Sequence, residues 1–247
     1  QDSPVMPETL RDLMLARLDR LSPSTREVLR IASASGTLMD HAVLRALVGP
    51  DEAALDACLR EAVSGQVLVV DTAREAYAFR HALMREAVHD DLLPGEHARL
   101  HARYAEAMEK LGRDDQAGEI AHHWSAAHEA DRSFAWSLRA AEHARARYAW
   151  QEQLAHLERA LDLWDQVHDP AVAAGADRAE LLVRASRAAA NVAQPDRAIA
   201  LVDAALREVD PVRDPDRAAR LHVRRAQGCE AVRIDPMADL DEALTLA

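Results

Sequence analysis

Histidine pairs are the first residues in this 247-residue sequence that could do chemistry. His97 and His101 are four residues apart, which is the spacing at which two helical histidines bind zinc in metalloproteases. Those enzymes need a glutamate directly after the first histidine, and here that position is Ala98, so we expect no zinc site at this pair. A denser group comprises His122, His123 and His128. This group has no carboxylate or cysteine at matching spacing, so we interpret its members as surface residues of helices and expect no metal site.

Other catalytic patterns are missing from the sequence. It has no Gly-x-x-x-x-Gly-Lys-Ser/Thr phosphate loop, and the surroundings of its single lysine, Lys110, do not fit one. It has no Gly-x-Ser-x-Gly nucleophile motif either. Cys58 and Cys229 match no paired metal or redox spacing, and this favours a reducing, cytoplasmic location. We therefore expect no enzyme in this chain and no cofactor bound by the chain alone.

Polar residues recur at helical spacing in the second half of the sequence. They would share one face of each of three expected helices, 131–148, 177–193 and 216–230, away from an apolar stripe such as Leu138, Ala141, Ala144 and Tyr148. The residues are Arg139, His143 and Arg147, then Arg184, Arg187 and Asn191, and finally Arg220, Arg224 and Gln227. Arginines gathered in one groove would favour an acidic protein segment or a small anionic inducer. In the alternative reading, each arginine is solvated or paired with an acidic residue one turn away.

The composition limits the class of partner. Thirty basic against 42 acidic residues give a net charge of −12, which repels phosphate backbones and anionic membrane surfaces. No apolar run reaches the ~18 to 20 residues of a membrane span, and no signal peptide opens the chain. We expect a cytoplasmic chain that binds neither nucleic acid nor membrane directly.

The first 95 residues predict a winged helix. Ser22 followed by Pro23, then Asp40 and Asp51, are typical caps of three successive short helices. Two β-rich runs follow, Val67 to Asp71 and Tyr77 to Arg80, separated by a polar turn. They indicate a hairpin, and they are the only β pattern in the sequence.

The third of these helices argues against DNA binding. It would span residues 51–63 and would be the helix that enters the major groove. It carries four acidic residues, Asp51, Glu52, Asp56 and Glu61, against Arg60 alone. Because phosphate contacts dominate affinity for DNA, this helix predicts a winged helix that contacts protein instead.

Residues 96–247 predict a mainly α arm with tetratricopeptide-like repeats. Helical periodicity covers eight segments, namely 96–111, 115–128, 131–148, 150–166, 177–193, 196–209, 216–230 and 236–246. Small residues recur where paired helices approach closely, with Ala198, Val202 and Ala205 as the clearest set. The spacing exceeds the ~34 residues of a standard repeat, and we place the excess in loops at 169–176 and 210–216. The first helices of such pairs line the concave surface of the solenoid.

Several segments resemble one family. The most specific is Tyr77 to Val88, which contains Phe79-Arg80-His81, and it continues through Asp91-Leu92-Leu93-Pro94 to Arg99-Leu100-His101. Shorter matches are Pro7 to Leu13, Leu21-Ser22, Ala121 to Trp124 and Glu158 to Leu161. Together they resemble large actinobacterial LuxR-type transcriptional regulators, which are MalT-like STAND ATPases.

The resemblance implies a role for this chain in a longer regulator. Proteins of that family consist of an ATP-binding domain, a winged helix, a helical-repeat sensor and a LuxR helix-turn-helix, in that order. This sequence matches the winged helix and the helical-repeat sensor. ATP and ADP are then cofactors of the full-length protein. The resemblance also implies that His81 contacts the β-phosphate of ADP when the upstream ATPase domain is present. An unregulated protein-binding scaffold, or the equivalent module of another ATPase-linked signalling protein such as a cyclase-linked one, remains the alternative.

Overall fold

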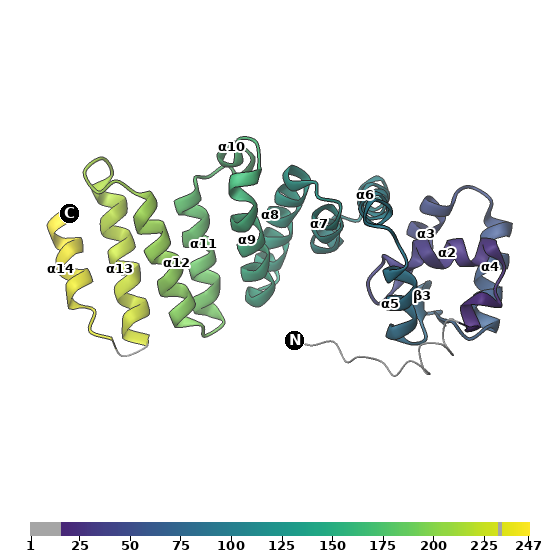
Figure 1. Ribbon diagram of the computed structural model, residues 1–247. Coiled ribbons are helices and arrows are strands. Elements are labelled where there is room, and N and C mark those ends of the chain that lie inside the picture. The colour runs from purple at the N-terminus through teal and green to yellow at the C-terminus, as the bar shows by residue number, and fades with distance from the viewer. Residues whose placement is uncertain (1–15, 232–233) are drawn as a thin grey trace. The chain divides into compact units, whose positions relative to one another are not determined.

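The chain is mainly helical and forms two compact units (Figure 1). The computed structural model describes residues 16–231 and 234–247. The first unit reaches Arg113 and includes residues 126–128, and the second comprises 114–125 and 129–247. The part of the family resemblance at Pro7 to Leu13 lies outside the described residues. No helix in the described ranges is both long and apolar enough to cross a membrane.

Three short helices begin the first unit, as the sequence predicts. They are α2 (Pro23–Ser33), α3 (His41–Val48) and α4 (Glu52–Ser64). Ser22, Asp40 and Asp51 precede them, and each side chain accepts a hydrogen bond from a main-chain N–H in the first turn of its helix. These bonds satisfy donors that a helix start leaves without partners, and they fix where each helix begins.

A small antiparallel sheet follows, with one strand more than expected. Its strands are β1 (Met39–Asp40), β2 (Leu68–Asp71) and β3 (Ala76–Phe79), in the order β1-β3-β2. The hairpin of β2 and β3 is confirmed. Met39 pairs with Tyr77 and adds β1 to the other edge of β3. The expectation that the hairpin is the only β structure was wrong, because a two-residue strand is too short to show alternation in the sequence.

Two further helices complete the first unit. They are α5 (Ala82–Asp90) and α6 (Pro94–Lys110). Tyr104 of α6 donates a hydrogen bond from its hydroxyl to the carbonyl oxygen of Ile31 at 2.9 Å, and Arg113 forms an ion pair with Asp40. These contacts place α6 with the winged helix, so the boundary between the units lies near residue 113 and not at residue 95, where the change of sequence pattern suggested it.

The second unit is a row of antiparallel helices (Figure 1). They are α7 (Ala117–Ala126), α8 (Ala130–Ala146), α9 (Trp150–Leu163), α11 (Arg178–Asn191), α12 (Pro195–Glu208), α13 (Pro215–Ala231) and α14 (Met237–Leu246). Two short 3-10 turns, Asp114–Gln116 and Trp164–Gln166, accompany them. Consecutive helices pack most closely, and the pairs α8–α9, α11–α12 and α13–α14 form a tetratricopeptide-like solenoid. A short helix, α10 (Pro170–Ala174), occupies the first of the two expected loops.

Small buried residues let these helices approach one another. Ala160, Ala185 and Ala205 are fully buried, and they lie in one core with Phe134 that runs through α8, α9, α11 and α12. The turns after α8 and α11 contain Tyr148 and Ala193 in the left-handed region, with φ of 58° and 56°. Tyr148 is therefore turned outward and is 76% exposed, so its place in the apolar stripe of α8 was wrong.

His156 of α9 is a partly buried titratable side chain in the second unit. Its Nδ1 atom is buried and makes no hydrogen bond to the residues that the structure describes, and its ring lies against Gly118. Burial, followed by the charge of Arg159, lowers the pKa of His156 below its ordinary 6.5, while Glu152 opposes the shift.

We expect the free energy of unfolding to fall as the pH drops below about 6.5, because the unfolded chain then binds a proton that the folded His156 resists. Above that pH the ring of His156 is neutral in both the folded and the unfolded chain, so it does not lower the free energy of unfolding. Urea unfolding at neutral pH and at mildly acidic pH measures the effect. The decrease is expected to be smaller in His156→Gln, and an equal decrease in both proteins would assign it to other groups.

Candidate functional site

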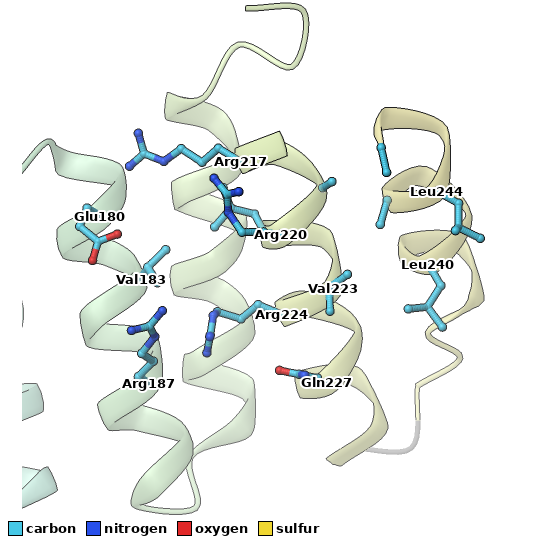
Figure 2. A pocket seen from close by; sticks show the side chains of 14 residues that line it. Glu180, Val183, Arg187, Arg217, Arg220, Val223, Arg224, Gln227, Leu240 and Leu244 are labelled. Carbon is cyan, nitrogen blue, oxygen red and sulfur yellow. The ribbon is translucent and has the colours of Figure 1, made fainter. Parts of the chain in front are cut away.

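A cavity in the second unit lies between α11, α13 and α14 (Figure 2). Its volume is about 720 Å³. Four of the predicted groove residues line it, namely Arg187 from α11 and Arg220, Arg224 and Gln227 from α13. The two helices are the first members of consecutive pairs, and positions 220, 224 and 227 share one face of α13. The structure therefore brings together side chains that are separated by more than thirty residues in the sequence.

Arginines outnumber the acidic side chains in the lining of the cavity, which also includes Glu180. Within the described ranges, Arg187, Arg220 and Arg224 have no hydrogen-bonded or ion-pair partner. Burial, and next the like charge of Arg187, lowers the pKa of Arg224, while the charge of Glu180 opposes the shift. Figure 2 shows the side chains of Arg187 and Arg224 directed toward each other across the space between their helices. Two like charges held close together favour a bound anion, because the anion offsets their repulsion.

Two neighbouring arginines are already neutralised. Arg217 forms a bidentate ion pair with Asp177, the residue that caps α11, and this pairing lowers the pKa of Asp177. Arg184 pairs with Glu180 one turn earlier at 3.3 Å. Arg184 is thus paired one turn away, as the alternative reading describes, whereas Arg187 and Arg220 are exposed to solvent and have no ion pair in the described part of the chain.

The opposite wall of the cavity is apolar, and the sequence reading missed it. Val183, Val223, Leu240 and Leu244 contribute side chains to it. Val223 and Leu244 are exposed. These apolar residues come from α11, α13 and α14. Periodicity within one helix does not reveal which residues of another helix lie beside it. The complete site suits a ligand that carries an anionic group next to an apolar portion.

Arg184 and Asn191 line a smaller adjoining cavity of about 460 Å³. Here α8 contributes Glu142 and Arg145, which pair with each other at 2.9 Å. Arg184 is paired as well, so most of the charge in this cavity is compensated internally. The excess positive charge is concentrated on the side of α13.

The three predicted residues of α8 line neither cavity. Arg139 lies over the ring of Trp136, with its guanidinium carbon 4.5 Å from the ring centroid. Arg147 pairs with Glu152 at 3.3 Å, and His143 is exposed. The expected face of α8 was wrong. The buried surface of this helix includes Ser133, Ser137 and Ala140 and is wider than the apolar stripe that the sequence predicted.

In the first unit, His81 lies where the hairpin gives way to α5. Its side chain is exposed and makes no capping bond to the helix, while its carbonyl oxygen accepts a hydrogen bond from Met84 N–H at 3.0 Å. The imidazole is thus available beside the main-chain N–H groups at the start of α5. On α4, Glu52 and Asp56 are exposed and form ion pairs with Arg45 and Arg60, and Glu61 accepts hydrogen bonds from Ser22 and Thr25.

Histidines 97 and 101 are joined by a third that the sequence reading did not consider. His89, near the end of α5, lies beside His97 and His101 of α6, and one ring nitrogen of each lies within 4.8 Å of the others. Burial, followed by the charges of His97 and Arg85, lowers the pKa of His89. The surface interpretation of the second histidine group is correct for His122 and wrong for His123, which is buried in α7.

Comparison with known proteins finds a likeness of fold. Neither a protein-family model nor a curated protein matches the sequence. A solved structure of a Signal Transduction ATPase with Numerous Domains (STAND) protein with a tetratricopeptide repeat sensor, PH0952 from Pyrococcus horikoshii, is 13% identical with a TM-score of 0.54. The match covers 99% of this chain and 33% of that protein. BtubC from P. vanneervenii is 16% identical with a TM-score of 0.35 over 92% of this chain and 89% of that one.

Proposed function

We propose that this chain is the regulatory region of a LuxR-type STAND ATPase transcriptional regulator in the cytoplasm. Its repeat arm binds an anionic inducer or an acidic protein segment, and its winged helix relates that binding to the nucleotide state of an ATPase domain. In this proposal the chain catalyses no reaction, and ATP or ADP binds only in the full-length protein. The likeness of fold to a STAND protein with a repeat sensor supports it.

The observation that carries the proposal is the set of unpartnered arginines in the cavity between α11 and α13. Arg187, Arg220 and Arg224 gather in a chain whose net charge is −12. An exposed arginine in so acidic a protein finds a carboxylate partner readily, as Arg184 and Arg217 do. Three that face a cavity without one retain their capacity for charge-assisted hydrogen bonds to a ligand.

The winged helix supports the other half of the proposal. The acidic exposed face of α4 suits contact with protein, and the exposed His81 lies at the N-terminus of α5. A neutral imidazole donates one hydrogen bond, and the N-terminus of a helix favours an anion. This arrangement suits the contact to a nucleotide phosphate that the family resemblance implies.

Charge reversal in the cavity tests the proposal. Each hydrogen bond to a charged group is worth about 1.5–3 kcal/mol, so we expect Arg187→Glu with Arg224→Glu to weaken binding of an anionic ligand about 100-fold or more. The probes are a labelled peptide of alternating Glu and Leu and a fatty acid with a labelled chain, each titrated by fluorescence anisotropy.

The matched control is Arg213→Glu with Arg207→Glu, which changes the charge equally outside the cavity. Peptide binding lost only in the cavity variant would support a protein partner, and the same result with the fatty acid would support a small inducer. Equal affinity in the cavity and control variants would contradict the proposal. In the full-length regulator, the cavity variant should also lose its response to the inducer.

A further inference from the structure

Three histidines from two helices converge in the first unit. His97 and His101 lie one turn apart on α6, and their ring centroids are 4.4 Å apart. His89 reaches them from α5, with centroids 4.7 Å from His97 and 5.8 Å from His101. The rings therefore form a compact triangle, although His89 and His101 are twelve positions apart in the sequence.

The triangle has the dimensions of a metal site before a metal is bound. One nitrogen of each histidine lies within 4.8 Å of the other two. Around a tetrahedral zinc ion, with Zn–N distances of about 2.0–2.1 Å, nitrogens lie about 3.3 Å apart. Rotation of the side chains by roughly an ångström at their tips covers the difference without movement of the helices. His101 is 3% exposed, whereas His89 and His97 are partly exposed, so an ion would be enclosed on one side and open to solvent on the other.

A serine hydroxyl lies beside the ring of His89. Its Nδ1 atom is 3.5 Å from the hydroxyl oxygen of Ser33, and this hydroxyl donates its own proton to the carbonyl oxygen of Arg30 at 2.8 Å. The serine oxygen is left to accept a hydrogen bond from Nδ1–H. This bond favours the tautomer in which Nε2 carries a free lone pair, as second-shell partners do in histidine metal sites.

We propose that His89, His97 and His101 bind a divalent transition-metal ion, with Zn²⁺ as the physiological choice. Three imidazoles without a carboxylate or thiolate select zinc, nickel or copper over magnesium or calcium. A fourth position on the open side is left to water or to a ligand. The ion would connect the end of α5 to α6 and so fix the helix that begins directly after His81.

Zinc titration of the tag-free, chelator-stripped chain tests this site. Isothermal titration should show one tight Zn²⁺ per chain. Changes to second-shell partners alone weaken metal binding by 10–100-fold, so loss of a ligand in His97→Gln is expected to weaken it by about 100-fold or more. His168→Gln is the matched control, because His168 is 90% exposed and lies outside the cluster. Circular dichroism checks that each variant is folded.

X-ray absorption of the zinc-loaded wild-type chain gives an independent measurement that needs no variant. It should show three imidazole nitrogens at about 2.0–2.1 Å. Affinity that is unchanged in His97→Gln, a spectrum with fewer than three imidazoles, or no stoichiometric binding to the wild-type chain would each overturn the site. None of these results depends on the arginine-lined cavity, so the two proposals stand or fall separately.

Discussion

Replacing Arg225 with methionine is expected to lower the free energy of unfolding by about 2–4 kcal/mol. Arg225 of α13 donates to Asp203 of α12 and to Asp239 of α14, at 2.6 Å for the second contact. Asp239 is 5% exposed, and its other partner is His222 at 3.1 Å. Without the guanidinium, a buried carboxylate loses its principal counter-charge, and such a charge is costly.

The double variant Arg225→Met with Asp239→Leu separates charge from packing. If the buried carboxylate causes the loss, its removal should recover most of the stability, and urea unfolding measures each protein. A double variant as unstable as the single one would instead assign the effect to packing of the arginine stem. The result matters for function because these contacts hold α13 to α12 and to α14, and α13 and α14 both line the cavity.

Replacing Phe134 with alanine should lower the free energy of unfolding of the second unit by about 3–5 kcal/mol. Phe134 is fully buried, and its ring meets Trp164 edge-on, with centroids 6.0 Å apart and planes at 70°. The substitution removes a large apolar side chain and leaves a space that the alanine-rich helices around it cannot fill.

The milder Phe134→Leu provides the comparison for that variant. It retains much of the buried volume, so its loss should be smaller than that of the alanine variant, and tryptophan fluorescence during urea unfolding follows both. A loss below about 1 kcal/mol for Phe134→Ala would mean that the core collapses onto the vacated site, contrary to the dense packing inferred here.

Local signals in the sequence predicted the helix starts well. Ser22, Asp40 and Asp51 act through hydrogen bonds to amides two or three residues later, so nothing distant is needed to place them. The strand β1 and the boundary after α6 depend on pairing with residues far along the chain, such as Met39 with Tyr77 and Tyr104 with Ile31. Such contacts are set by tertiary packing, which periodicity in one segment does not describe.

The candidate site was predictable in part for the same reason. Positions 220, 224 and 227 share a face in any helix, and the repeat pattern placed that face opposite Arg187. The choice of face on α8 failed because this helix is buried on more than one side. His89 was missed because its partners are on another helix, and only the turn between α5 and α6 brings it back to them.

The order of packing in the repeat arm has a mechanical consequence. Each helix of the second unit packs chiefly on its immediate neighbours in the chain. Bending of the row is therefore distributed over the separate helix–helix interfaces. α11 and α13 are separated along the chain by α12, yet both line the same cavity. A ligand held between them would span the two interfaces that α12 makes, one with α11 and one with α13. It would reduce bending of the arm at these interfaces without adding a contact anywhere else.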